Sequence, residues 1–241
     1  MGISQKRLSD NLQRVADNIA AAAGRVRRDP ANVRLVAVTK SADLDDVKAL
    51  IELGVVDIGE SRVQQLTARA EQIGQWLARR RKAGPAEVRW HMVGHLQRNK
   101  VRHVLPWAST IHSVDSLRLA EEIANRAAQA QRSVDALLQV NCSEEPQKFG
   151  VAVGAAAHLA EQVCTLKTLR LIGLMTMGPL VSDPEKARPA FVRLREIFEE
   201  MRNEKIGGRD FCHLSMGMTQ DYQVAVEEGA TIVRIGTALF E

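Results

Sequence analysis

Eight short apolar segments, separated by longer stretches of helical periodicity, constrain the fold of this chain more than any other feature. Between these segments, apolar residues recur at helical spacing, as at Leu44, Val47, Leu50 and Ile51. Strands that alternate with helices are joined by right-handed crossovers and form a parallel sheet. The predicted strands are residues 33–38, 55–59, 88–93, 110–114, 136–141, 169–175, 211–215 and 231–236.

Eight strand–helix units within 241 residues have the size of a (β/α)8 TIM barrel, an α/β fold. A doubly wound open sheet is the alternative, but the chain has neither a GxGxxG turn after its first strand nor a GxxxxGK[ST] loop. An apolar stripe from Leu8 to Ile19 predicts an extra helix before the first strand. The eighth strand is followed by few residues, too few for the helix that usually ends such a barrel. We expect the N-terminal helix to pack against the barrel where that last helix would lie. No linker rich in Pro, Gly or Ser interrupts the chain, which predicts a single domain over residues 1–241.

Composition narrows the classes of function. The net charge is only +4, and the one dense basic run, residues 79–82, falls at the end of a predicted helix, so we expect no nucleic-acid partner. No apolar stretch approaches the roughly 20 residues that span a bilayer, so we expect no membrane contact. The cysteines Cys142, Cys164 and Cys212 are three in number and widely spaced, which indicates reduced thiols in a cytoplasmic protein. We also expect a monomer.

Two histidines have the spacing of helical zinc ligands. His91 and His95 are four residues apart, but His91 falls in a predicted strand, Gly94 intervenes and no glutamate completes an HExxH motif. We therefore predict no metal site.

Polar residues and glycines follow the predicted strands at their carboxyl ends, where a barrel of this kind carries its active site. The seventh strand leads into HLSMGMTQD (213–221) and the eighth into RIGTALF (234–240). Glycines there would let backbone N–H groups approach an anion closely, and a helix expected over 218–228 would add its N-terminus. The loops after strands seven and eight commonly bind phosphate in such barrels, so we predict a phosphate site at this position.

Lys40 follows the first strand, on the same side of the barrel. A lysine near a phosphate site can form a Schiff base with a carbonyl, which requires a neutral amine, and partial burial would favour that form. If Lys40 points inward, strand alternation turns Val36 and Val38 inward as well. Pyridoxal 5'-phosphate and a phosphorylated sugar both suit this chemistry, so the residues alone leave a cofactor-binding protein and a Schiff-base aldolase open.

Several motifs along the chain resemble one known family. They are LVAVTK (35–40), DIGES (57–61), WHMVGHLQRNK (90–100), IHSVDS (111–116), QVN (139–141) with KFGV (148–151), GLMTM (173–177), LSMGMTQD (214–221) and RIGTALF (234–240). Together, and in this order, they resemble the pyridoxal-phosphate homeostasis proteins from about residue 5 to the C-terminus.

The resemblance implies a single-domain barrel of the alanine racemase N-terminal type that holds pyridoxal phosphate as a Schiff base on Lys40. It implies phosphate-binding elements at Ser215 and Gly217 and at Gly236 and Thr237. It also implies that Arg234, Met175 and His91 lie close to the cofactor. One position departs from the family pattern: Ser61 stands where the motif usually has asparagine, which leaves any contact of that amide in doubt.

The same resemblance favours binding over catalysis. Racemases of the related fold need a second base, a tyrosine from a separate domain, whereas this chain has one tyrosine, Tyr222, in a predicted helix. An arginine such as Arg234 near the cofactor would weaken the electron sink that a carboxylate at the pyridine nitrogen strengthens. The sequence therefore predicts a non-catalytic protein that buffers pyridoxal phosphate or delivers it to apoenzymes. The alternative is a racemase whose missing base comes from elsewhere.

Overall fold

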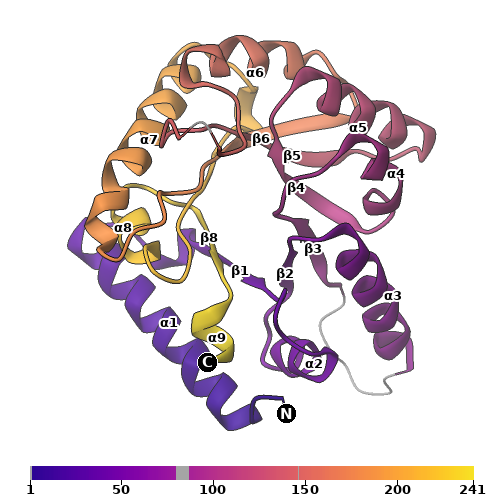
Figure 1. The fold of residues 1–241 in the computed structure, drawn as a ribbon, viewed down its shortest axis with the longest axis vertical. Helices are drawn as coiled ribbons and strands as arrows, with labels where there is room; N and C mark the ends of the chain where they lie inside the picture. Colours follow the sequence, from indigo (N-terminus) through magenta and orange to yellow (C-terminus); the bar gives the residue numbers. More distant parts are fainter. Residues whose placement is uncertain (1, 80–86, 146) are drawn as a thin grey trace.

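Eight parallel strands close into a barrel in the order β1 to β8, as the alternating pattern predicts (Figure 1). The computed structural model describes residues 2–79, 87–145 and 147–241. The strands are β1 (Arg34–Val38), β2 (Asp57–Glu60), β3 (Arg89–Met92), β4 (Ala108–Val114), β5 (Val134–Gln139), β6 (Leu169–Met175), β7 (His213–Ser215) and β8 (Ile232–Ile235). All eight predicted strands are confirmed, with ends that differ by at most two residues and with both ends of β6 as predicted.

Closure of the barrel depends on β1, which pairs in parallel with β2 on one side and β8 on the other. Ala37 lies opposite Ile58 of β2 and opposite Ile235 of β8. Since every described strand has two neighbours, the sheet has no open edge, and all carboxyl ends meet at one face of the barrel.

Helices surround the strands as an outer ring (Figure 1). They are α1 (Gln5–Arg25), α2 (Leu44–Glu52), α3 (Val63–Arg79), α4 (Val101–Val104), α5 (Leu117–Gln129), α6 (Ala156–Cys164), α7 (Arg188–Asn203), α8 (Tyr222–Glu227) and α9 (Thr237–Phe240). None of the helices in the described ranges is long and apolar enough to cross a membrane. Of the basic run at 79–82, Arg79 ends α3 and the other three residues lie outside the described ranges.

The extra N-terminal helix is confirmed as α1, which lies beside α8 and α9 (Figure 1). Its apolar stripe is buried, with Leu8 and Val15 at or near zero exposure. Asn11 Nδ2 donates to the carbonyl of Leu239 (3.0 Å), and Asn18 Nδ2 donates to the Tyr222 hydroxyl (2.9 Å). The leading helix thus covers the outside of the barrel next to its closing strands, as expected.

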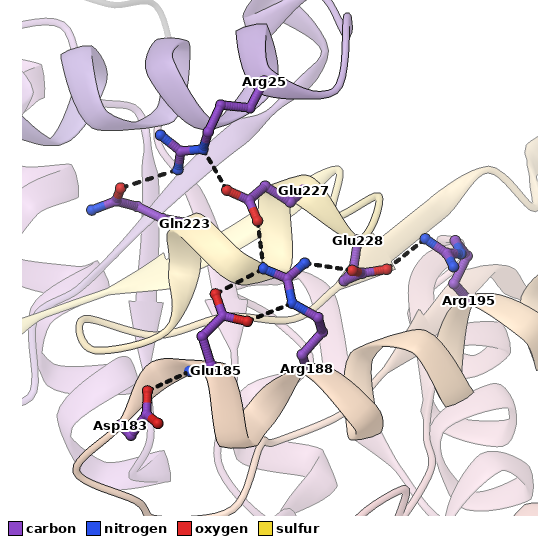
Figure 2. Close-up of polar contacts among 8 residues, drawn as sticks. All are labelled: Arg25, Asp183, Glu185, Arg188, Arg195, Gln223, Glu227 and Glu228. Atoms are coloured by element: carbon purple, nitrogen blue, oxygen red, sulfur yellow. Dashed lines mark hydrogen bonds and ion pairs between the residues drawn. The ribbon is translucent and has the colours of Figure 1, made fainter.

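An ion-pair network joins α1, α7 and α8 around Arg188 (Figure 2). The Arg188 guanidinium contacts Glu185 (2.7 Å), Glu227 (2.6 Å) and Glu228 (2.6 Å). Arg25 of α1 reaches the same Glu227 (2.6 Å), and Arg195 reaches the same Glu228 (2.6 Å). The carboxylates of Glu227 and Glu228 are mostly buried, so α8 depends on these cations to hold its last turn.

The barrel interior has its own small apolar core, apart from the larger core between the strands and the helices. It consists of Val36, Val93, Leu137, Ile172, Met175 and Ile232, with Val38 and Met177 packed against it. Gly59 completes the packing, because a Cβ at that position would lie 2.8 Å from Val36 Cγ1. This inner core is the floor on which the residues at the carboxyl ends of the strands rest.

The helix expected from residue 218 begins instead at Tyr222. Met218 donates its N–H to the Asp221 carboxylate (2.6 Å), so the preceding residues form a turn around that side chain. The consequence is a loop of residues 216–221, rather than a helix N-terminus, at the mouth of the barrel.

The Arg188 network yields a stability prediction. Arg188→Met leaves the mostly buried Glu227 and Glu228 with fewer cationic partners, so we expect the free energy of unfolding to fall by about 2 kcal/mol, between the values for exposed and buried pairs. Arg193→Met is the matched control on the same helix, because its pair with Glu196 is half exposed, and it should change stability by less than about 0.5 kcal/mol. Urea denaturation measures both, and equal losses would contradict the role of the network.

Candidate functional site

A cavity of about 440 Å³ opens at the carboxyl ends of the strands. Four of the residues singled out from the sequence lie in its wall: Lys40, Arg234, Gly236 and Thr237. The rest of the wall is formed by Val38, Ser61, Val93, Gly94, Met177, Pro179, Leu180, Val181, Pro184, Met218, Thr219, Gln220 and Asp221. The volume falls within the range of small-molecule sites, about 300–1,000 Å³.

Lys40 is held by a buried cluster of polar groups just outside β1. The Thr39 hydroxyl donates to Glu60 Oε1 (2.5 Å), and the Arg69 guanidinium from α3 donates to that same oxygen and to the carbonyls of Thr39 and Ala42. Glu60 is fully buried, so Arg69 compensates its charge. The cluster fixes the backbone on both sides of Lys40.

The Lys40 side chain is exposed at the mouth of the cavity. The partial burial expected from the sequence is therefore not observed. The inward orientation of the strand is confirmed, because Val38 lines the cavity with Lys40, and Val36 belongs to the inner core below.

The loops that follow β7 and β8 meet at one side of the cavity. Ala238 donates its N–H to Thr219 Oγ1 (3.3 Å), and Arg234 donates its N–H to the Gly217 carbonyl (3.0 Å). Gly217 has a φ of +91°, and a Cβ there would lie 2.6 Å from that of Ala225. This glycine is required by the turn and by its packing against α8, below the cavity wall.

Arg234 is a buried cation in the wall of the cavity. Its Nη1 donates to Ser215 Oγ (2.6 Å), and its Nη2 donates to the Thr176 carbonyl (2.9 Å). Burial lowers the pKa of Arg234 to about 10, and Asp221 opposes this shift. The guanidinium thus keeps its charge at neutral pH, and no carboxylate of the described residues forms an ion pair with it within 4 Å.

A chain of buried hydrogen bonds continues from Ser215 down through the barrel. His112 Nδ1 lies 2.9 Å from Ser215 Oγ, and His112 Nε2 lies 2.9 Å from His91 Nδ1. His91 Nε2 lies 2.9 Å from Asp57 Oδ1, and the two Asp57 oxygens also accept from Arg89 (2.7 and 2.6 Å).

The electrostatics of this chain follow from burial. Burial lowers the pKa of His112 well below its usual value, and it lowers the pKa of His91 despite the adjacent Asp57. Burial alone would raise the pKa of Asp57, but hydrogen bonds from Arg89 and His91 hold it far below its usual range. At neutral pH, both imidazoles are neutral and the carboxylate is ionised.

Four residues singled out from the sequence lie below the cavity wall rather than in it. Met175 belongs to the inner core, Ser215 and His91 belong to the hydrogen-bonded chain, and Gly217 forms the turn. Conversely, sequence reasoning missed Thr219 and Asp221, although both stand in the quoted HLSMGMTQD segment. Strand alternation predicts that the side chain of Ser215, the last residue of β7, points into the barrel rather than into the cavity at its mouth.

The two histidines with zinc-like spacing make different contacts. His91 is bonded within the barrel, whereas His95 stacks on Phe149 with ring centroids 4.0 Å apart. In the described ranges, no three His, Cys, Asp or Glu side chains are grouped as a metal site would require.

Sequence comparison places this barrel among known proteins. The profile of the alanine racemase N-terminal domain matches residues 11–241. A pyridoxal phosphate homeostasis protein of Aquifex aeolicus is 36% identical over 231 residues, which cover 96% of this chain and 96% of that protein. A protein of the same name from Pseudomonas aeruginosa is 35% identical over 97% of this chain and 94% of its own length.

Solved structures give the same picture. A protein of unknown function from Bifidobacterium adolescentis superposes with a TM-score of 0.90 at 41% identity, covering 98% of this chain and 95% of the other. PipY of Synechococcus elongatus, solved with pyridoxal phosphate bound, superposes with a TM-score of 0.78 at 30% identity, covering 92% and 100%. An alanine racemase of Clostridium difficile, 14% identical over 97% of this chain and 56% of its own, shares the fold with a TM-score of 0.72.

The cluster beside Lys40 can be tested by removing its cation. Arg69→Met leaves the fully buried Glu60 without a compensating charge, so we expect the free energy of unfolding to fall by about 3 kcal/mol or more. Adding Glu60→Gln to this variant should restore part of the lost unfolding free energy, because it removes the buried carboxylate that no longer has a cationic partner. Arg62→Met, an exposed change one residue before α3, should cost less than about 0.5 kcal/mol in the same denaturant titrations. No recovery in the double variant would contradict this account.

The buried histidines predict a loss of stability in mild acid. Since the pKa values of His91 and His112 are lower in the folded protein than the usual 6.5, the unfolded chain binds more protons below that pH. Stability is therefore full above about pH 6.5 and falls below it, by up to about 1.4 kcal/mol per pH unit for each histidine. Unfolding measured from pH 7.5 down to about 5 tests this slope, with the exposed His158→Gln as a control that keeps it. A flat profile would show that the imidazoles already carry protons.

Proposed function

Because the chain belongs to the alanine racemase N-terminal domain family, and within it to the pyridoxal phosphate homeostasis proteins, we propose that it binds pyridoxal 5'-phosphate reversibly and controls its free level in the cell. The observation that carries this proposal is the cavity at the strand ends, in which an exposed lysine and a buried guanidinium, with no ion-pair partner among the described residues, share one wall. The relatives of that name and the pyridoxal-phosphate complex of PipY support it.

The donor set of the cavity fits this cofactor. Pyridoxal phosphate is an anion, and the wall carries the two cations Lys40 and Arg234. Gly236 leaves room beside the β1 backbone, because a Cβ there would lie 2.9 Å from the Val38 carbonyl oxygen. When bound, the cofactor would supply an aldehyde, and the Lys40 amine would be the group that holds it.

The proposal gives separate tasks to the polar residues of the wall and to the residues below it. Lys40 anchors the aldehyde, while Thr219, Gly236 and Thr237 bind the phosphate through hydroxyl and backbone N–H groups at the meeting point of the two loops. Arg234 directs its charge at the ring. Met175, Ser215 and Gly217 act from below, by packing the floor and by orienting these groups. Ser61, which lines the wall, offers one hydroxyl in place of the usual amide.

We propose that this site binds without catalysing a reaction. Proton transfer at two faces of the cofactor needs two bases, and the single tyrosine, Tyr222, is buried in α8 with its hydroxyl accepting from Asn18. An exposed Lys40 at the mouth of the cavity also suits release of the cofactor to another protein. We propose pyridoxal-phosphate-dependent apoenzymes as the receivers, and a monomeric, cytoplasmic protein whose residues 1–241 act as one domain.

The Lys40 assignment predicts a selective loss of binding. Lys40→Ala removes the amine, so titration with pyridoxal phosphate should give no visible absorbance band of the bound form, and affinity should fall by about a hundredfold or more. Lys48→Ala, a lysine of α2 paired with Asp45 away from the cavity, should bind like the wild type. Equal binding by Lys40→Ala would overturn the assignment.

Turnover assays separate this function from its alternatives. The loaded wild-type protein should transfer pyridoxal phosphate to an apoenzyme and should not interconvert L- and D-amino acids at a steady rate. Robust racemisation would favour the racemase alternative, and cleavage of a sugar phosphate without added cofactor would favour an aldolase.

A further inference from the structure

The side chains between Arg234 and Asp57 form one continuous path through the inside of the barrel. It runs from Arg234 to Ser215, His112, His91 and Asp57, with successive heavy-atom distances of 2.6, 2.9, 2.9 and 2.9 Å. These side chains come from β8, β7, β4, β3 and β2, so the path crosses the barrel rather than following one strand. All five residues are at most 6% exposed, so bulk water does not reach them and their polar atoms depend on one another.

The two ends of the path fix the direction of every hydrogen bond within it. The guanidinium of Arg234 can only donate, so Ser215 Oγ accepts at that end. The Asp57 carboxylate can only accept, so His91 Nε2 must carry a proton at the other end.

The middle of the path follows from the neutral state of the two rings. Neutral His91 with a proton on Nε2 has a free lone pair on Nδ1, so His112 must donate to it through Nε2. Neutral His112 then accepts at Nδ1, and the donor found there among the described residues is the Ser215 hydroxyl. In this arrangement every donor has an acceptor.

The opposite arrangement fails. A proton on both nitrogens of His91 would make His112 donate to Ser215 Oγ, which would then accept two N–H groups while its own hydrogen pointed at no acceptor. It would also place a buried positive charge on His91, which the nearby cations Arg34 and Arg89 oppose. Of the other ionisable groups near the rings, Arg89 pairs with Asp57 and His213 is half-buried beside Thr231, outside the path.

We propose that this one-way path makes Ser215, His112 and His91 positioning residues, which hold the Arg234 guanidinium in a fixed orientation towards the cavity. Ser215 is then no phosphate ligand, because its hydrogen is committed to His112 and its oxygen to Arg234. The effect of this path on cofactor binding rests on the proposed function. The direction of the hydrogen bonds and the fixed orientation of Arg234 do not depend on that function.

The direction of the path is testable in the cofactor-free protein by nitrogen-15 NMR of the histidine rings. We expect two histidines, assigned to His91 and His112 by their loss in His91→Gln and His112→Gln, to be neutral, protonated on Nε2 and unchanged across roughly pH 5.5 to 8. Protonation on Nδ1, or titration of either ring in this range, would overturn the proposal.

The positioning role is tested by Ser215→Ala, which removes the link between His112 and Arg234. In the cofactor-free variant, guanidinium resonances of Arg234 should show rotation about the Nε–Cζ bond at least tenfold faster than in the wild type. His213→Asn is the matched control, since this residue lies two positions earlier on the same strand but outside the path. Unchanged rotation in Ser215→Ala would refute the positioning role, whether or not the protein binds the cofactor.

The same variants then connect the path to the cofactor. A hydrogen bond to a charged group is worth roughly a tenfold to a hundredfold change in affinity. We therefore expect Ser215→Ala to bind pyridoxal phosphate more weakly by that factor. His213→Asn should bind it like the wild type. If the wild type itself does not bind pyridoxal phosphate, the proposed function fails while the NMR results still decide the path. If Ser215→Ala binds like the wild type, the path has no role in binding.

Discussion

A guanidinium buried inside the barrel is the constraint on which the rest of this site depends. Removing a charge from water is costly unless hydrogen bonds and opposite charges compensate it, and Arg234 has no carboxylate of the described residues as an ion-pair partner. Its Nη1 and Nη2 donate to Ser215 and Thr176, and the Asp221 carboxylate, which forms no ion pair with it, acts on its charge from a distance. The positive charge left at the cavity is what an anionic cofactor would neutralise.

Two parts of the barrel hold the site in place, the inner apolar core and the polar cluster beside Lys40. Inside, the apolar floor around Val36 and Met175 gives the cavity its base. Outside β1, the polar cluster of Glu60 and Arg69 fixes the backbone that carries Lys40. Lys40 is therefore fixed at its backbone and exposed at its side chain, which is the combination that the proposed binding and release of a cofactor needs.

The fold was largely predictable from the sequence because each strand of a parallel barrel is buried on both faces and reads as a short apolar run. The helix α1 was predictable as well, because its apolar stripe from Leu8 to Ile19 must be buried against the barrel. The site was predictable only in outline. Lys40, Arg234, Gly236 and Thr237 follow from strand ends and from the family pattern, and all four lie in the cavity wall.

What the sequence did not reveal depends on contacts between distant residues. The Asp221 carboxylate accepts a hydrogen bond from the Met218 N–H, and α8 therefore begins only at Tyr222. No local sequence pattern distinguishes that turn from the start of a helix. Single hydrogen bonds in the path from Ser215 to Asp57 join residues up to 103 positions apart, through ring nitrogens whose neighbours are known only once the barrel is closed. The position of Ser215 at a strand end predicts a ligand, and its hydrogen bonds to Arg234 and His112 become visible only in the folded barrel.

Reductive labelling tests the central claim most directly. The wild-type protein, loaded with pyridoxal phosphate, is treated with borohydride, digested and examined by mass spectrometry. The account predicts one labelled peptide, with the modification on Lys40. Absence of label, or label spread over several lysines, would contradict a cofactor site at the mouth of this barrel.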